Sequence, residues 1–422
     1  MAIKPNYEKI DGCEFYPADI MYEYKQCIDE GLDIEKYKEL FEAVSKLPHD
    51  EITHDLGDTI FKIVSGAPMR ADYEFNEPSE LEKIKALRKP YPVKGTVNRD
   101  TLRDKVHGAW LGRICGCMLG KTVEGIRSDE FIPFLKETGN YPLSRYIEGM
   151  PADDDTNYMV LAQIIREKYG KDFTPYSISI AWMDYQPKYA YCTAERVAFC
   201  NFVKGFTPPE SAIYKNPYRE WIGAQIRGDY WGYINPGNPE LAAEMAWRDA
   251  SISHVKNGIY GEMFVAAMLA NAAVTSNIED IILSGLAQIP STSRLYKSIG
   301  EILKMYRDGV KQNEVFDYIH SCYDEHTGYG WCHTISNAMI VTASLLYGEG
   351  DYANSICMAV QACFDTDCNG ATVGSILGMA NGVGSIPEYW TKPINNILHT
   401  SILGVGTVKI TDMVDKTMNH IQ

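Results

Sequence analysis

Residues 107–125 read HGAWLGRICGCMLGKTVEG, with a glycine at every fourth position. Residues four apart lie one above the other on a helix, so these glycines would form one smooth face. Each glycine inside a helix costs about 1 kcal/mol relative to alanine, and several of them need a compensating gain. We expect that gain to be the close approach of a second helix. The face carries Gly108, Gly112, Gly116 and Gly120.

A second glycine row near the C-terminal end supplies the expected partner. It comprises Gly370, Gly374, Gly378 and Gly382. Arg113 and Lys121 interrupt the first segment, which excludes the membrane-helix interpretation of this spacing. We therefore predict that the two helices pack closely in the centre of the molecule. If they are antiparallel, Glu124 at the end of the first lies beside Asp365 at the start of the second.

The rest of the chain predicts an all-α fold, because strand-like alternation is scarce. Residues 1–95 are expected to form a mostly helical extension, in which DIEKYKELFEAVSKL (33–47) places its apolar residues on one helical face. The stretch 88–100, with two prolines and a glycine, is typical of a linker. Residues 96–422 are expected to form one helical bundle, with a long irregular insert at 219–240. Helices are expected at 101–121, 156–168, 174–187, 240–255, 259–274, 278–287, 296–309, 313–322, 333–347, 351–363 and 370–381.

Composition narrows the function classes. The chain has 422 residues and a formal net charge of −16, which argues against binding to nucleic acid phosphates. The N-terminus lacks an apolar signal core, and no run approaches the roughly 18 residues of a membrane span. Eleven cysteines at irregular spacings predict reduced thiols and a cytoplasmic protein. The sequence does not indicate an oligomeric state.

Two acidic clusters each precede a predicted helix. PADDDTNYM (151–159) carries Asp153, Asp154 and Asp155, and FDTDCNG (364–370) carries a second pair of aspartates. A helix cap explains one acid at each start, since aspartate favours the N-cap and the positive end of the helix dipole. Adjacent carboxylates also repel one another, and a divalent cation would relieve that repulsion. Oxygen ligands of this kind suit Mg²⁺, Mn²⁺ or Ca²⁺. Both interpretations remain open from the residues alone.

Taken together, these motifs resemble the ADP-ribosylglycohydrolase family, which includes dinitrogenase-reductase-activating glycohydrolase and ADP-ribosylhydrolases. GAWLGRICGCMLGKTVEG (108–125) is similar to the family's opening glycine-rich helix, which ends in an acid. DDDT (153–156) is similar to its Thr-Asp-Asp-Thr-like segment, and FDTDCNGATVGSILG (364–378) to its Gly-Asp-Thr-Asp-Thr segment with the small-residue helix after it. The resemblance spans about residues 100–400. It implies an all-α fold with one or two metal ions, usually Mg²⁺ or Mn²⁺, that bind the ribose diol of ADP-ribose.

The resemblance also implies roles for individual residues. Glu124 matches the acid that handles the water or substrate, and Asp155 is a second catalytic candidate. Three positions depart from the family's pattern. Asp153 and Cys368 stand where the family often has threonine ligands, and Cys117 stands where it commonly has an aspartate. The implied metal ligands are Asp154, Asp155, Asp365 and Asp367.

Several other residues have both a structural and a functional interpretation. His254 would be either a helix-end histidine or a substrate contact. Tyr230 and Trp231 in the insert would either pack on the surface or stack on a base or sugar. Asp153 and Asn157 are further candidates for substrate contact. A nucleophilic role for Cys368 is disfavoured, because neighbouring carboxylates raise a thiol pKa and no histidine is close in sequence.

The sequence therefore predicts a metal-dependent hydrolase that cleaves an N- or O-glycosidic bond at the ribose of an ADP-ribosyl or related ribosyl substrate. An ADP-ribosylated protein and a small molecule are both possible substrates, and the long extension with the aromatic insert favours a small free riboside or nucleoside. The alternative is a catalytically weak or inactive ADP-ribose-binding relative. The five retained carboxylates argue against this alternative, whereas the Asp153 and Cys368 departures argue for it.

Overall fold

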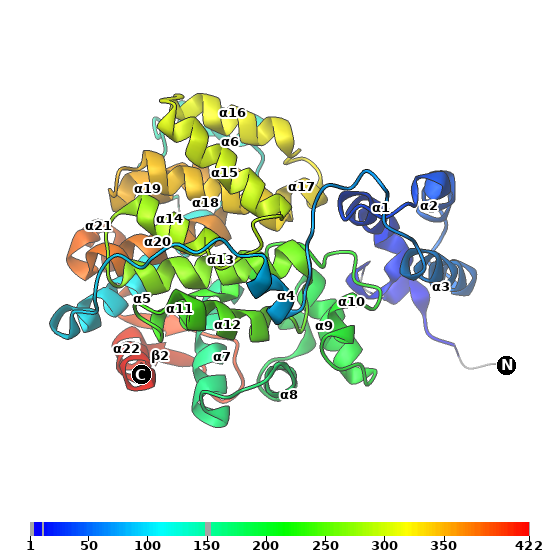
Figure 1. Cartoon of the computed structure of the whole chain (residues 1–422), viewed down its shortest axis with the longest axis horizontal. Helices are drawn as coiled ribbons and strands as arrows, with labels where there is room; N and C mark the ends of the chain where they lie inside the picture. The colour runs from blue at the N-terminus through cyan, green and yellow to red at the C-terminus, as the bar shows by residue number, and fades with distance from the viewer. Residues whose placement is uncertain (1–3, 11, 148–152, 422) are drawn as a thin grey trace.

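The computed structural model describes residues 4–10, 12–147 and 153–421 (Figure 1). This part of the chain contains 22 α-helices and one two-stranded sheet, which confirms the predicted all-α fold. Every helical segment expected between residues 101 and 381 corresponds to a helix of the structure. In the sheet, β1 (Ile397–His399) pairs antiparallel with β2 (Thr407–Lys409).

The helices fall into an N-terminal group and the body of the molecule. The N-terminal group comprises α1 (Ile20–Asp29), α2 (Lys38–Val44), α3 (Glu51–Ser65) and α4 (Leu81–Ala86). The first half of the body comprises α5 (Arg99–Lys121), α6 (Ser128–Glu137), α7 (Asp154–Tyr169), α8 (Pro175–Tyr185), α9 (Thr193–Val203), α10 (Glu210–Ile213), α11 (Asp229–Tyr233), α12 (Pro239–Ala250) and α13 (Lys256–Ala272). The second half comprises α14 (Ile278–Leu286), α15 (Arg294–Arg307), α16 (Gln312–Cys322), α17 (Gly328–Cys332), α18 (Thr334–Tyr347), α19 (Tyr352–Gln361), α20 (Thr366–Asn381), α21 (Glu388–Thr391) and α22 (Ile410–His420).

The glycine rows of α5 and α20 pack against each other, as predicted. A Cβ atom on Gly116 would lie 1.9 Å from the carbonyl oxygen of Gly370, and one on Gly112 would lie 2.2 Å from that of Gly374. Because side chains are missing on both faces, the two backbones touch directly. The pairing runs antiparallel, so that Gly120 at the end of α5 lies against Thr366 at the start of α20.

Gly382 continues this row beyond the end of the helix, since a Cβ on Gly108 would lie 2.7 Å from its carbonyl carbon. Helix α20 ends at Asn381, and Gly382 is its C-cap with a φ of 81°. This left-handed conformation is the one that favours glycine after a helix end. The fourfold spacing of the second row therefore continues one position beyond the helix that it describes.

Helix α13 fills the interior beside this pair. All its residues after Lys256 are buried, and it packs against α20 on one side and α12 on another. A helix that is apolar or small on every side is typical of the core of a large protein. It is therefore part of the scaffold that holds α20 in place.

The insert at residues 219–240 is buried and partly helical, rather than irregular as predicted. It contains the helix α11 and a 3-10 helix at Gln225–Arg227. Its core is the fully buried guanidinium of Arg227, which forms ion pairs with Glu195 and Asp249 at 3.1 Å and with Glu262 at 3.6 Å. These carboxylates come from three other helices. The residue spacing within the insert therefore could not indicate that they would pair with Arg227.

The N-terminal extension is tied to the body by a second buried network. Figure 1 shows α1, α2 and α3 at one end, with the chain after α4 running across the body to α5. Arg219 of the body binds Glu23 of α1 at 2.8 Å and Glu30, the C-cap of that helix, at 2.6 Å. Arg294 binds Glu77 of the extension and Glu220 of the body. The extension is therefore held to the body by charge pairs that are largely removed from water.

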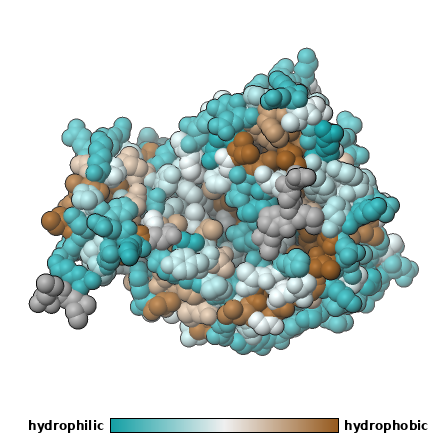
Figure 2. Space-filling model, turned by 180° about the vertical axis from the view of Figure 1, so that it is seen from behind, coloured by the Kyte–Doolittle hydropathy of each residue, from teal (hydrophilic) through white to brown (hydrophobic). Residues whose placement is uncertain are grey.

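Two further observations concern the surface and the cysteines. The face in Figure 2 is mostly hydrophilic, with apolar residues in separate patches. Among the described residues, no helix combines the length and apolarity that crossing a membrane requires. All eleven cysteines are free thiols, as predicted.

The glycine rows predict a large stability cost for a single methyl group. In Gly116→Ala the new Cβ would meet backbone, which cannot give way as a side chain can, so we expect a loss of about 3 kcal/mol or more of unfolding free energy. Gly300→Ala in α15 is the control, because nothing lies within 4 Å of its Cβ position. It should be neutral or stabilising by up to about 1 kcal/mol. Urea unfolding measures both variants.

The Arg227 cluster predicts a pH-dependent stability. Burial raises the pKa of Glu195 to about 7 from an ordinary value of 4.5, although Arg227 opposes the shift. Between these pH values the folded chain binds the proton and the unfolded chain does not, so the unfolding free energy should fall as the pH rises through this window. Glu195→Gln should weaken this fall, whereas Glu137→Gln on exposed α6 should not. Urea unfolding at about pH 5 and about pH 8 checks the sign.

Candidate functional site

A cavity of about 500 Å³ opens where the end of α5 meets the start of α20. The predicted antiparallel crossing therefore brings the two acidic clusters to one place. Segments that are far apart in sequence form its walls, including α9, the insert, α17 and the C-terminal region. The lining includes Lys121, Glu124, Asp153, Asp154, Asn157, Cys192, Glu195, Trp221, Trp331, Cys332, Asp365, Asp367, Cys368 and Ser401.

Lys121 lies among three of these carboxylates. Its Nζ is 2.5 Å from Glu124 Oε2, 2.9 Å from Asp153 Oδ2 and 3.5 Å from Asp367 Oδ2. Burial lowers the pKa of Lys121, but Asp367 and Asp153 outweigh this effect and raise it above its ordinary value. The ammonium therefore remains charged and neutralises part of the cluster.

Asp155 points away from the cavity, although Asp154 next to it lines the wall. Successive residues of a helix project in directions about 100° apart, so neighbouring aspartates at a helix start cannot face the same way. The Asp155 carboxylate accepts from the buried Arg113 at 2.8 Å, and Arg113 also pairs with Asp229 at 3.0 Å. The structure thus gives Asp155, predicted as a catalytic residue, a place behind the cavity wall.

Within the two acidic clusters, three buried carboxylate oxygens have no hydrogen bond to the described residues. They are Oδ2 of Asp155, Oδ1 of Asp365 and Oδ1 of Asp367. An unpaired charge of this kind is costly in a protein interior unless a cation accompanies it. The oxygens of Asp365 and Asp367, with the Cys368 sulfur, lie within 4.8 Å of one another, as does a second group of Cys117, Asp153 and Asp155. The donor set fits a divalent cation.

The pKa shifts of these acids agree with this assignment. Burial, together with the neighbouring Asp153 and Glu124, raises the pKa of Asp367 to about 7, although Lys121 opposes the shift. Burial, together with the charge of Asp367, also raises the pKa of Asp365. The pKa of Asp154 is raised by burial and by its two neighbouring aspartates. A bound cation would reverse the charge repulsion and favour the ionised forms.

The thiols at the site are not nucleophiles. Burial raises the pKa of both Cys117 and Cys368 well above the ordinary value, and nearby aspartates raise it further. Cys368 lies beside Asp155 and Asp365, so its thiol remains protonated there in the absence of a cation. A protonated thiol attacks poorly.

The helix-cap and site interpretations both apply to the first acidic cluster. Asp153 is the N-cap of α7 and accepts from the Asp155 backbone N–H at 2.9 Å through one oxygen, while its other oxygen faces Lys121. Asn157 lines the cavity, but its amide exchanges hydrogen bonds with Ser401, each 3.0 Å long. It therefore positions the C-terminal segment that forms one wall. In the second cluster Asp365 is the N-cap of α20 without making a side-chain cap bond.

His254, Tyr230 and Trp231 do not line the cavity. All three side chains are fully buried. His254 Nδ1 contacts the Ser253 hydroxyl at 2.8 Å beside the Arg227 cluster, and burial lowers its pKa well below the ordinary value. Trp231 donates to Asp249 at 3.0 Å, and the Tyr230 hydroxyl contacts His420 at 2.6 Å. These predicted substrate contacts are therefore buried packing residues, two in the insert and His254 between α12 and α13, and the sequence did not indicate their burial.

The aromatic wall comes from Trp331, whose stretch also carried a stacking interpretation from the sequence, and from Trp221, which was not predicted as a site residue. Trp221 and Trp331 line the cavity, and the Trp221 indole N–H is buried without a partner among the described residues. Trp331 donates to the carbonyl of Phe364, and the Arg127 guanidinium lies 4.5 Å from its ring centre. Trp331 lies in TGYGWCH, and Trp221 in the insert, so the aromatic content of both stretches was the available signal.

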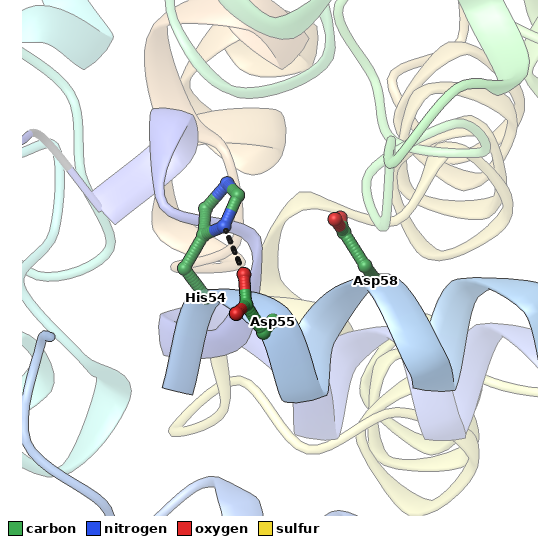
Figure 3. Close-up of side chains that lie close together, drawn as sticks. All are labelled: His54, Asp55 and Asp58. Atoms are coloured by element: carbon green, nitrogen blue, oxygen red, sulfur yellow. Dashed lines mark hydrogen bonds and ion pairs between the residues drawn. The ribbon is translucent and has the colours of Figure 1, made fainter. Parts of the chain in front are cut away.

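The molecule has a second acidic group, on α3, and a second, larger cavity. On α3, His54, Asp55 and Asp58 lie on one side of the helix (Figure 3), but Asp58 is already paired with Lys215. A larger cavity of about 870 Å³ lies between the extension and the body. Its exposed cations are paired with neighbouring acids: Lys25 with Asp29, and Arg70 with Asp72. Neither feature gathers unpaired buried carboxylates.

Comparison with known proteins agrees with this geometry. The model of the ADP-ribosylglycohydrolase family matches residues 98–421. A solved structure described as an ADP-ribosylglycohydrolase-related protein complex matches with a TM-score of 0.50 and 18% identity, over 76% of this chain and 98% of that chain. This likeness shows a shared fold. None of the curated proteins compared with the chain matches it. The chain therefore belongs to the ADP-ribosylglycohydrolase family, whose members are hydrolases acting on glycosyl bonds.

Proposed function

We propose that the protein is a metal-dependent hydrolase that cleaves a glycosidic bond at the ribose of its substrate. The observation that carries this proposal is the convergence of unpaired, buried carboxylate oxygens with Glu124 at one cavity. The acids of the Arg227 cluster share a buried guanidinium, whereas the structure shows no arginine or lysine paired with Asp365 among the described residues. Asp365 and Asp367 would hold the cation, and Asp154 and Asp155 of the first acidic cluster are the further candidate ligands.

The cation, Mg²⁺ or Mn²⁺, would supply Lewis acidity at the sugar when bound. Glycosidic cleavage passes through an oxocarbenium-like state, and the cavity carboxylates would stabilise its positive charge. Glu124 is the exposed acid at the mouth, where its side chain could accept the proton that the attacking water loses. Lys121 holds this carboxylate at 2.5 Å. Glu124 is therefore our candidate for the general base.

The cavity favours a small, uncharged riboside over an ADP-ribosyl group. Lys121 is the only basic side chain among the described lining residues, and three carboxylates already surround it. The diphosphate of ADP-ribose would meet negative charge instead of the cationic donors that phosphates require. Trp221 and Trp331 offer ring faces for a base. Eleven free thiols agree with a cytoplasmic location.

We expect hydrolysis of ribosides with added Mg²⁺ or Mn²⁺, its loss with EDTA and its return when the ion is restored. Nucleosides should be cleaved faster than ADP-ribosylated arginine or serine substrates. Product release followed by chromatography measures each rate. Preference for the ADP-ribosyl substrates would contradict the substrate assignment alone. Binding of ADP-ribose with no turnover of any substrate would instead identify the chain as an inactive relative.

Glu124→Gln should lower kcat by about 10²- to 10⁴-fold, because the amide cannot accept a proton from water. KM should change less, since glutamine preserves the shape of the cavity mouth. Glu130→Gln, at an exposed position of α6, is the matched control and should retain full activity. Steady-state kinetics under saturating metal measures both. Unchanged hydrolysis by Glu124→Gln would remove Glu124 from the catalytic role.

A further inference from the structure

The described residues include two groups that could hold a cation at the site. One comprises Asp365, Asp367 and Cys368, and the other comprises Cys117, Asp153 and Asp155. All six side chains are buried. The two groups differ in their surroundings, because Arg113 and Lys121 pair with both carboxylates of the second group, whereas in the first group Lys121 approaches Asp367 alone, at 3.5 Å.

In the Cys117 group, each carboxylate has a cationic partner. Asp153 Oδ2 lies 2.9 Å from the Lys121 ammonium, and Asp155 Oδ1 lies 2.8 Å from Arg113. Both cations come from α5. In the other group, Oδ1 of Asp365 and Oδ1 of Asp367 have no hydrogen-bond partner among the described residues. Negative charge thus remains to be balanced mainly on the Asp365 side.

The packing of α5 on α20 fixes the position of Lys121. Gly120 lies against the Thr366 backbone, where a Cβ would be 2.2 Å from the Thr366 carbonyl oxygen. Lys121, which follows Gly120, therefore lies beside Asp367. A lysine in the last turn of a helix is also favoured by the helix dipole. Its three N–H donors meet three carboxylates, so the ammonium is fully satisfied.

We propose that this centre holds one divalent cation, at the Asp365–Asp367 group, and that the Lys121 ammonium occupies the place of a second. The proposal rests on the metal-dependent function proposed above. A second divalent ion would need Asp153 Oδ2, the oxygen that Lys121 now contacts, and two cations cannot share that position without strong repulsion. Removal of the ammonium should therefore create a second ion site.

Equilibrium dialysis against Mn²⁺, with bound metal counted per chain, tests this inference without any substrate. The unchanged protein should bind one Mn²⁺ at saturation. Lys121→Met, which keeps the length of the side chain and removes its charge, should bind two. Lys85→Met is the matched control, because Lys85 has the same 27% side-chain exposure and also contacts two carboxylates. It should still bind one ion.

Two Mn²⁺ ions in the unchanged protein would overturn the inference while leaving the metal-dependent function intact. A single ion in a folded Lys121→Met variant would also overturn it, and thermal unfolding with and without Mn²⁺ establishes that this variant is folded. If the unchanged protein binds no ion, both this inference and the proposed function fail. The count in the unchanged protein tests the proposal even where the variant does not fold.

Discussion

The direct contact between the backbones of α5 and α20 is the constraint on which the rest of the structure depends. Glycines on both helices remove the side chains that normally keep helix axes 8–10 Å apart. The contact joins the end of one helix to the start of another far away in sequence. The second acidic cluster forms the start of α20, and the first acidic cluster lies beside the end of α5. The geometry of the acidic site is therefore set by helix packing in the scaffold rather than by a local loop.

Buried arginines complete this scaffold. Arg113 sits on the glycine helix itself and joins the start of α7 to the insert through Asp155 and Asp229. Arg227 performs the same task between the insert and three other helices. Breaking a buried ion pair leaves a charge without its partner in the protein interior, which is strongly destabilising. These ion pairs therefore hold the side chains that they join in fixed positions. They explain why one aspartate of the first acidic cluster faces the cavity and the next faces the core.

The fold was predictable from the sequence wherever residues of one kind recur at regular spacing along the chain. The glycine spacing, the helical segments and the two acidic clusters were all visible as patterns along the chain, and the fold and family followed from them. The prediction did not extend to contacts between remote segments. Nothing near Trp231 indicated that Asp249 would accept a hydrogen bond from its indole, and Lys121 was noted only as a charge that interrupts the glycine segment. The aromatic wall at Trp221 likewise depends on how the insert folds.

The family match begins at residue 98, yet the molecule does not divide there. Tyr22 of the extension packs edge-on against Trp221 with ring centres 5.3 Å apart, on a residue that lines the cavity. The extension also supplies Glu23 and Glu30, the two acids that pair with buried Arg219. The extension thus contributes one ring beside the cavity and two acids to a buried ion-pair network of the matched region. A chain shortened to the matched residues would leave the Arg219 guanidinium buried without these two carboxylates.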